Sequence, residues 1–368
     1  MEGTFMKNFF ASTKGIVLAG LTIGLGAAVL QKLGNPGNMG VCVACFGRDV
    51  AGSLGLHRAE TVQYARPEIF ALVIGAFMAA LSSGEFRPRA GSNPLTHFLL
   101  GALVGVGALI FLGCPWRAML RLAGGDLNAV VGILGLIVGA SLATRFVKKN
   151  FSLGAAKPAN LPLGLIFVLF MAALLLLRVM FPPVADQPKN GLLLYSLQGP
   201  GSLHAPLWAS LVIALLIGFV GQRSRFCSVG AVQGLILFRS GHLMLGTLGF
   251  IAAAFIANLA FGQFKLGWSG QPIAHSLHFW NFLGLLVVGF GSALAGGCPG
   301  RQLFLAGEGD GDAALFSLGL LGGLAMAHNW GLASSSAGLG PNGAVAGALC
   351  VILIFAIAWS GLRKPAAA

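Results

Sequence analysis

The feature that most limits what this chain can fold into is a series of long apolar runs with few charges between them. An α-helix needs about 20 apolar residues to cross a bilayer, and the runs have that length. Hydrophobic residues make up 56% of the sequence and charged residues only 9%, whereas a soluble domain carries about 25% charge. The chain is therefore predicted to be an all-α integral membrane protein.

The apolar runs predict about ten transmembrane helices, five in each half of the chain. The predicted spans cover residues 15–33, 68–83, 96–113, 127–146, 161–181, 205–222, 243–262, 280–297, 313–330 and 343–362. The 56 glycines are too many for ordinary core helices, and membrane helices use glycine where their backbones come close.

A short motif occurs twice, as Cys114-Pro-Trp-Arg117 and Cys298-Pro-Gly-Arg301. Half the length of the chain separates the two copies. Each copy follows a glycine at the end of an apolar run, and each is followed by a Gly-Asp pair, Gly125-Asp126 and Gly309-Asp310. Packing alone does not explain a duplicated cysteine and arginine within apolar sequence, so the motif is the first candidate for the functional site.

Cys42 and Cys227 are related by nearly the same interval, and each follows the first span of its half. Each begins a helix-like segment, 42–54 or 227–240, that is too short to span a membrane. Segments 115–123 and 299–306 after the Cys-Pro motifs are equally short. Broken helices of this kind occur at membrane depth only where they are buried in protein or line a cavity. We therefore expect four re-entrant half-helices.

An odd number of spans in each half places the two halves in opposite orientations. The sequence thus predicts two inverted five-helix repeats, residues 1–184 and 185–368, in one membrane domain. Many transporters have this plan, and their substrate site lies near the midplane between the repeats.

The net charge of +13 is spread over loops and is not interleaved with aromatic residues, which argues against nucleic-acid binding. Lys and Arg concentrate in cytoplasmic loops of membrane proteins. Lys7, Lys14, Lys148 and Lys364 lie where both termini would be cytoplasmic. Arg48, Arg58 and Arg66 count against that orientation, but the balance favours it.

The chemistry of Cys-Pro-x-Arg follows from its position at a helix start. Proline suits the first helical position, which places Cys114 and Cys298 at the N-cap. The free N–H groups there and the positive end of the helix dipole favour an anion. Arg117 and Arg301 add a fork that binds oxyanions. A thiol beside hard oxygen ligands suits a small sulfur- or selenium-containing anion better than phosphate.

Plainer interpretations apply to several of these residues. Buried free cysteines usually behave as small hydrophobic residues, and Cys350 is predicted to do only that. Cys42 and Cys45 form a C-x-x-C sequence, but a structural zinc site needs four ligands and no second such pair exists, so no metal site is predicted. Arg223 and Arg225 are candidate anion ligands, and the plainer interpretation of Arg223 is that it extends to the membrane interface.

The paired motifs, with Arg223-Ser-Arg-Phe-Cys227 and two copies of Gly-Cys-Pro-x-Arg, resemble the YeeE/YedE sulfur-transport family. The likeness covers nearly the whole chain. The stretch Gly-Val-Cys42-Val-Ala-Cys45-Phe-Gly-Arg48-Asp49 is similar to the YedE-related subgroup associated with selenium metabolism. The extra Cys45 and Gly-Arg48-Asp49 depart from the thiosulfate-transport pattern and leave room for a selenium compound.

The resemblance implies a bacterial inner-membrane protein that takes up thiosulfate along a line of cysteines through transient S–H···S contacts. It makes Cys114 and Cys298 pathway thiols, with Cys42, Cys227 and Cys45 as further candidates. It also implies that a small cytoplasmic sulfur carrier of the TusA type receives the sulfur.

Three functions remain open on the sequence alone, of which the weakest is a membrane docking subunit for a cytoplasmic carrier. The first is a transporter or channel for a sulfur or selenium oxyanion. The second is a membrane thiol enzyme, in which Cys42 and Cys45 cycle through a disulfide or a thiol holds a persulfide or selenylsulfide. No acid–base pair and no cofactor motif is visible, which favours the transporter over the enzyme.

The two motif copies differ at one position, where Trp116 in the first corresponds to Gly300 in the second. We expect the Trp116 side of the site to be narrower and the Gly300 side to allow closer approach of the backbone.

Overall fold

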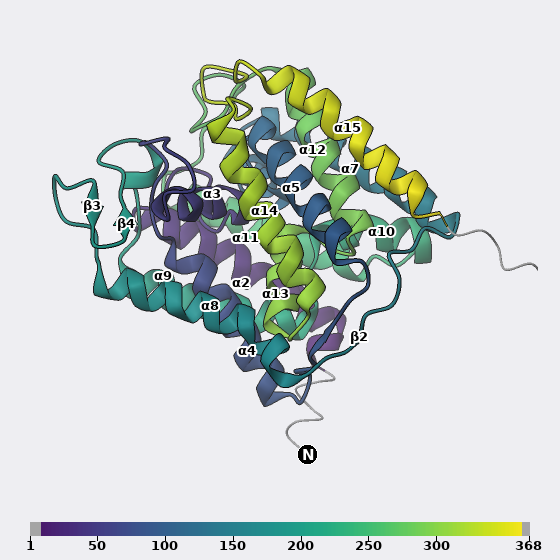
Figure 1. Cartoon of the computed structure of the whole chain (residues 1–368). Helices are drawn as coiled ribbons and strands as arrows, with labels where there is room; N and C mark the ends of the chain where they lie inside the picture. The colour runs from purple at the N-terminus through teal and green to yellow at the C-terminus, as the bar shows by residue number, and fades with distance from the viewer. Residues whose placement is uncertain (1–8, 363–368) are drawn as a thin grey trace, which may run out of the picture.

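The computed structural model describes residues 9–362, so Lys7 and Lys364, which contributed to the predicted orientation, lie outside the described residues. The fold is a bundle of tilted helices, and the long connection between Met180 and Leu207 extends from one side of it (Figure 1). Only two pairs of two-residue strands occur within residues 9–362, β1 (Arg89–Ala90) with β2 (Lys157–Pro158) and β3 (Lys189–Asn190) with β4 (Leu193–Leu194), both antiparallel. The prediction of an all-α membrane protein is confirmed.

Each predicted span corresponds to one long helix, and the ends agree within three residues. These helices are α2 (Thr13–Lys32), α4 (Pro67–Ser82), α5 (Pro94–Phe111), α7 (Asn128–Lys148), α8 (Leu161–Met180), α9 (Leu207–Ser224), α11 (His242–Ala260), α12 (His278–Leu294), α14 (Gly311–Asn329) and α15 (Gly343–Ser360). Within residues 9–362, nine helical stretches are long and apolar enough to cross a membrane. The remaining helix, α4, has 16 residues and a length of about 24 Å.

Four short helices also form where the sequence predicts them. They are α3 (Val43–Ser53), α6 (Pro115–Ala123), α10 (Ser228–Phe238) and α13 (Pro299–Gly307). Every residue of α3 is buried, α6 is buried except for Leu122, and α13 is buried except for Arg301 and Leu305. These three helices are therefore enclosed by the long ones, whereas only four of the 11 residues of α10 are buried.

The long helices pack in reciprocal pairs between the two halves of the chain. α2 packs against α11 while α4 packs against α9, and α5 packs against α14 while α7 packs against α12. Helices α8 and α15 depart from this pattern, because α8 lies mainly against α4 and α15 lies against α5 and α12. The two halves thus share most of their packing and differ in their last helix.

Glycine lets these helices touch backbone to backbone. Gly20 in α2, Gly75 in α4, Gly101 in α5 and Gly139 in α7 each face a carbonyl oxygen of the partner helix, and a Cβ at any of them would overlap that oxygen. The four positions belong to the four reciprocal helix pairs. This contact explains the high glycine content that the sequence shows, since small residues allow close helix packing in membranes.

The turns around the short helices have matching backbone conformations in the two halves. The residue that ends the turn after α6, Gly125, has φ 92°, and Gly309 after α13 has φ 93°. Leu112 before α6 has φ 65° and Gly296 before α13 has φ 83°. Left-handed backbone is unfavourable for leucine, and the carbonyl of Leu112 is held there by the guanidinium of Arg117.

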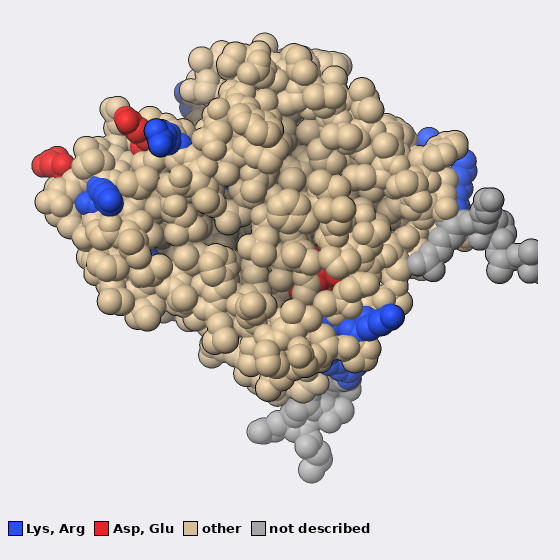
Figure 2. Space-filling view, viewed as in Figure 1, with Lys and Arg blue, Asp and Glu red and all other residues tan. Residues whose placement is uncertain are grey.

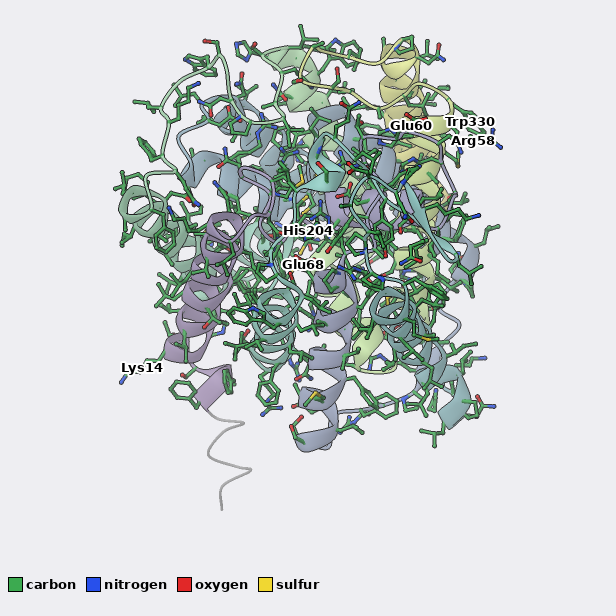
Figure 3. All side chains as sticks on the ribbon, turned by 90° about the vertical axis from the view of Figure 1, so that its left-hand side faces the viewer. Lys14, Arg58, Glu60, Glu68, His204 and Trp330 are labelled. Atoms are coloured by element: carbon green, nitrogen blue, oxygen red, sulfur yellow. The ribbon has the colours of Figure 1, made fainter. Side chains whose placement is uncertain are left out.

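The surface separates charged ends from uncharged sides. The face seen in Figure 2 is largely free of charge, and its Lys and Arg side chains gather at the margins. Figure 3 places Lys14 at one end of the molecule and Arg58, Glu60 and Trp330 at the opposite end. Exposed leucines, isoleucines and phenylalanines cover the long helices between these ends, as expected for helices that contact lipid.

Candidate functional site

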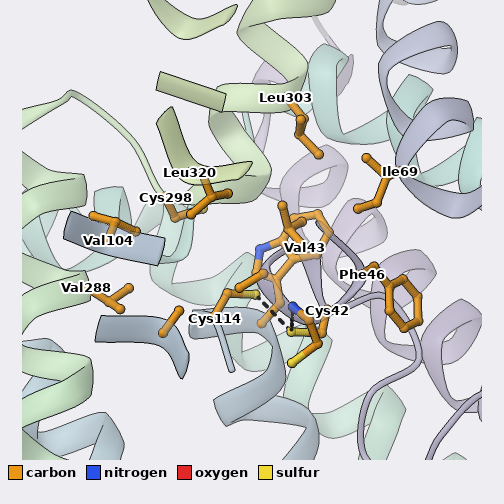
Figure 4. Close-up of a cluster of buried hydrophobic side chains, with 14 of the residues drawn as sticks. Cys42, Val43, Phe46, Ile69, Val104, Cys114, Val288, Cys298, Leu303 and Leu320 are labelled. Carbon is orange, nitrogen blue, oxygen red and sulfur yellow. Dashed lines mark hydrogen bonds between the residues drawn. The ribbon is translucent and has the colours of Figure 1, made fainter. Parts of the chain in front are cut away.

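The structure brings Cys42 and Cys114 together in the interior. Cys42 is the N-cap of α3 and Cys114 is the N-cap of α6. Their sulfur atoms lie 3.8 Å apart (Figure 4), and both side chains are buried. We call these two residues the first thiol pair.

Cys227 and Cys298 form an equivalent second thiol pair. Cys227 is the N-cap of α10 and Cys298 is the N-cap of α13. The backbone N–H of Cys298 donates to the sulfur of Cys227 at 3.3 Å, and both side chains are buried. The cysteines of each half thus pair within that half, which the sequence does not predict.

The two members of each pair differ in how their sulfur is used. Cys42 accepts a hydrogen bond from the N–H of Cys45, and Cys227 accepts one from the N–H of Gly230, so both cap their own helices. Cys114 and Cys298 make no side-chain cap. The first turns of α6 and α13 therefore keep N–H groups available for another acceptor.

Cys45 lies one helical turn after Cys42 and does not share its position. Its sulfur lies 3.5 Å from Nη1 of Arg117 and donates to the carbonyl of Leu112 at 3.8 Å. Of the two C-x-x-C cysteines, Cys42 is the one in contact with Cys114. Cys45 is a neighbour of the pair that also contacts its arginine.

Arg117 is completely buried. Its guanidinium donates to the backbone carbonyls of Leu112, Asn38 and Ile273, the last at 3.0 Å. Among residues 9–362, no carboxylate lies within salt-bridge distance of Arg117. A buried cation held only by dipoles and a thiol leaves net positive charge beside the first thiol pair.

The second thiol pair has a different electrostatic environment. Arg301 lies 3.2 Å from the carboxylate of Glu308, at the end of α13. Glu308 also lies 3.5 Å from Arg89. The two equivalent arginines therefore differ, because Arg301 has a carboxylate partner and Arg117 has none among the described residues.

Arg223 and Arg225 lie away from the thiols, near the surface. Arg223 pairs with Glu85 at 3.3 Å, while Arg225 is exposed and has a left-handed backbone. Both line a surface cavity of about 460 Å³ together with Glu85 and His242. Ala11 also lines this cavity, so it opens at the end of the molecule where α2 begins.

The two aspartates of the Gly-Asp pairs have structural roles, with arginines outside the Cys-Pro-x-Arg motif as partners. Asp126 caps the start of α7 and pairs with Arg121 at 2.6 Å, not with Arg117. Asp310 caps α14 and pairs with Arg89, not with Arg301. Each carboxylate stabilises a turn next to a half-helix.

Several buried polar residues lie outside the predicted site. Asp49 holds both Arg48 and Arg66 at 2.7 Å, and the adjacent Arg48-Asp49 within an apolar helix is the sequence signal for it. His328 packs its ring on His57, with 4.6 Å between the centroids. Burial lowers the pKa of His57. Both histidines line a surface cavity of about 510 Å³ together with Arg58, which Figure 3 places at the end opposite Lys14.

Trp116 and Gly300 are in direct contact. A Cβ on Gly300 would lie 2.5 Å from Cζ2 and 2.7 Å from Cε2 of the Trp116 indole. The first turns of α6 and α13 thus approach each other, with the ring of one filling the space left by the glycine of the other. The expected closer approach at Gly300 is made by Trp116 itself.

Comparison with known proteins points to one family. Residues 223–362 match the family model described as sulphur transport. This stretch begins at Arg223 and includes Cys227, Cys298 and Arg301. The chain is also similar to the thiosulfate transporter TsuA of Spirochaeta thermophila, with 31% identity over 103 residues. That alignment covers 28% of this chain and 31% of the relative. The second half of the chain is therefore similar to the sulphur-transport family, and the chain spans about a third of the length of the curated relative that it matches.

Proposed function

We propose that the protein transports a small sulfur-containing oxyanion, with thiosulfate as the first candidate, by way of the two thiol pairs. The observation that carries the proposal is that each pair joins two buried cysteines at the N-caps of two short helices. The description of the matching family and the printed function of the relative support a sulfur anion.

The donors at each pair match the two ends of such an anion. A thiol donates a weak hydrogen bond, which suits a polarisable terminal sulfur or selenium. Backbone N–H groups at the uncapped starts of α6 and α13 suit the oxygens. Each helix N-terminus carries roughly half a positive charge, so an anion that loses its hydration is stabilised and a cation is repelled.

Because Arg117 and Arg301 differ in their carboxylate partners, the two thiol pairs are anion-binding sites of unequal affinity. Arg117 leaves net positive charge at the first pair, whereas the charge of Arg301 is offset by Glu308. The anion is therefore held more firmly at Cys42 and Cys114. An anion can pass from the tighter site to the weaker one, and so be conducted, only when neither site binds it too tightly.

The proposal includes an inverted repeat, with residues 1–184 and 185–368 as its units. The reciprocal helix pairs and the equal φ angles at Gly125 and Gly309 support it. Two opposed repeats would present the first and second thiol pairs to opposite sides of the membrane.

We place the protein in the bacterial inner membrane with both termini in the cytoplasm. The cavity lined by Arg223 and Arg225 is then the cytoplasmic mouth, and the cavity at His57 and His328 lies on the outer side. Reporter fusions after Lys14 and at the C-terminus test this orientation. Activity of an externally active reporter at either position would reverse it.

Uptake of radiolabelled thiosulfate into proteoliposomes tests the transport itself. The Cys114→Ala, Cys298→Ala double variant is expected to lose uptake, since each thiol pair then lacks the thiol that does not cap its own helix. Cys350→Ala is the matched control, because Cys350 is equally buried but lies in α15, away from both pairs. Uptake at the wild-type rate by the double variant would refute the thiol pathway.

Three further measurements separate the related functions. Competition of uptake by selenite and sulfite identifies the preferred anion. Mass spectrometry after exposure to substrate shows whether a thiol carries a persulfide or selenylsulfide, as a relay enzyme requires. Co-purification with a TusA-like carrier tests whether the sulfur passes to a protein on the cytoplasmic side.

A further inference from the structure

We infer that Trp116 is a specificity-determining residue of the transport route: its indole ring separates the two thiol pairs, and its N–H donates to an oxygen of the passing anion. This inference rests on the proposed function. It assigns a role to a residue outside the cysteines and arginines of the motif.

The position of Trp116 follows from two contacts. It lies two residues after Cys114, and its ring rests on Gly300, which lies two residues after Cys298. The ring therefore spans from the first turn of α6 to the first turn of α13. An anion that moves from one thiol pair to the other has to pass this ring.

The indole N–H of Trp116 is a buried hydrogen-bond donor that needs an acceptor. Trp116 has no exposed surface, and among the described residues its Nε1 has no hydrogen-bond partner. A buried donor without an acceptor is unfavourable, and buried tryptophan usually finds a partner. A group that is absent from the resting protein and accepts a hydrogen bond would satisfy it.

The direction of the N–H edge supports such an acceptor at α13. The indole atoms nearest to Gly300 are Cζ2 and Cε2, and Cε2 is bonded to Nε1. The N–H edge therefore lies at the start of α13, where Cys298 makes no side-chain cap. The indole N–H and the free backbone N–H groups of that turn are all donors, so their common ligand is an anion.

Aromatic side chains fix the ring in this place. Phe226, Phe250 and Phe304 lie around Trp116 with ring centroids 6.0, 6.3 and 5.9 Å away. Phe226 directly precedes Cys227, so this aromatic wall reaches the second thiol pair. A tightly packed ring with one polar edge admits a small oxyanion that hydrogen-bonds to that edge and resists larger or apolar solutes.

The first experiment compares Trp116→Phe with Trp280→Phe in proteoliposomes. Phenylalanine keeps an aromatic ring and removes the donor, so thiosulfate uptake is expected to fall at least about tenfold. Trp280 lies in α12 against Phe279, away from the motif, and its replacement is expected to leave uptake within about twofold. Wild-type uptake by Trp116→Phe would overturn the inference.

The second experiment removes only the donor and follows the ring. A benzothiophene analogue of tryptophan at position 116 replaces the N–H with sulfur at nearly constant shape, so loss of uptake assigns the effect to the hydrogen bond. In a protein that keeps Trp116 and has phenylalanine at the other five tryptophans, thiosulfate is expected to change the fluorescence saturably.

The outcomes distinguish failure of the role of Trp116 from failure of the proposed transport function. Thiosulfate uptake with no effect of the analogue and no fluorescence change would overturn the role of Trp116 and leave the transporter intact. Absence of thiosulfate uptake by the wild-type protein would instead overturn the proposed function, and the inference with it.

Discussion

The sulfur atoms of Cys42 and Cys114 lie 3.8 Å apart, although 72 residues separate the two cysteines in the chain. A disulfide has about 2.05 Å between its sulfur atoms, so a shift of roughly 2 Å would allow one to form. Mild oxidation is therefore expected to link Cys42 to Cys114 and to stop uptake until a reductant is added.

Peptide mapping by mass spectrometry identifies the link. Cys42→Ala should abolish it and Cys350→Ala should not. Full uptake by the linked protein would exclude Cys42 and Cys114 from the route.

Arg117→Gln is expected to raise the KM for thiosulfate about tenfold or more, because a hydrogen bond to a charged group is worth about 1.5–3 kcal/mol. Arg117→Lys keeps the charge but loses the planar fork, so its KM should lie between those of the wild type and Arg117→Gln. The measurement is the dependence of initial uptake on thiosulfate concentration. Equal KM values for all three proteins would remove Arg117 from anion binding.

Arg121→Gln provides the matched control for that series. It leaves the buried carboxylate of Asp126 without its cation, and breaking a buried ion pair costs about 3–5 kcal/mol. A lower melting temperature is therefore expected, in contrast to a mainly kinetic effect of Arg117→Gln. A larger loss of melting temperature in Arg117→Gln than in Arg121→Gln would indicate that Arg117 is mainly structural.

Glu308→Gln is expected to lower the KM several-fold, because it frees the charge of Arg301 beside the second thiol pair. The pair is partly exposed, with 12% of the Arg301 side chain and 11% of the Glu308 side chain accessible, so about 1 kcal/mol or less is at stake. Glu60→Gln is the control, since Glu60 is exposed at the other end of the molecule. A higher KM in Glu308→Gln would mean that Glu308 positions Arg301 for the anion.

Gly300→Ala places a methyl group where the Trp116 ring lies, at 2.5 Å from Cζ2. Uptake is expected to fall because the ring must move. Trp116→Phe in the same chain should relieve the overlap, so the double variant should lose less than the two single losses combined. The double-mutant cycle measures this coupling, expected at about 0.5–3 kcal/mol for residues in contact. Additive effects would contradict the contact.

Gly139→Leu is expected to lower the melting temperature and the yield of folded protein. A side chain there meets the backbone of α12, whose carbonyl oxygen at Leu286 faces Gly139, and small residues at such positions set the helix spacing. Gly241→Ala is the control, because no atom lies within 4 Å of a Cβ at Gly241. Unchanged stability of Gly139→Leu would show that α7 and α12 separate at little cost.

The helices and the N-cap cysteines could be predicted because their signals are local. An apolar run fixes a span by its length, and proline after cysteine fixes the start of a half-helix. The ends of α6 and α13 consequently agree with the prediction within one residue.

The partners of the charged residues could not be predicted in the same way. Asp126 lies nine residues from Arg117 in sequence yet pairs with Arg121, because Arg121 is at the end of α6 where the chain turns back. Arg301 and Glu308 sit at the two ends of α13, and the first copy has Gly124 where the second has Glu308, a difference that the prediction did not use. Asp310 pairs with Arg89 of the first half, so its partner depends on how the two halves pack together.

Trp116 and Gly300 occupy the same position in the two copies of the motif. The ring of Trp116 fits only because Gly300 has no side chain, so the two positions must hold different residues. In a symmetric dimer of identical halves, this position would hold either two rings or two glycines, giving overlap or an empty space. Joining both halves in one chain removes that restriction, because each copy can then change independently. An exchange of Trp116 with Gly300 would reverse the direction in which the ring crosses the interface, so the fused chain has a fixed polarity that no dimer of identical halves can have.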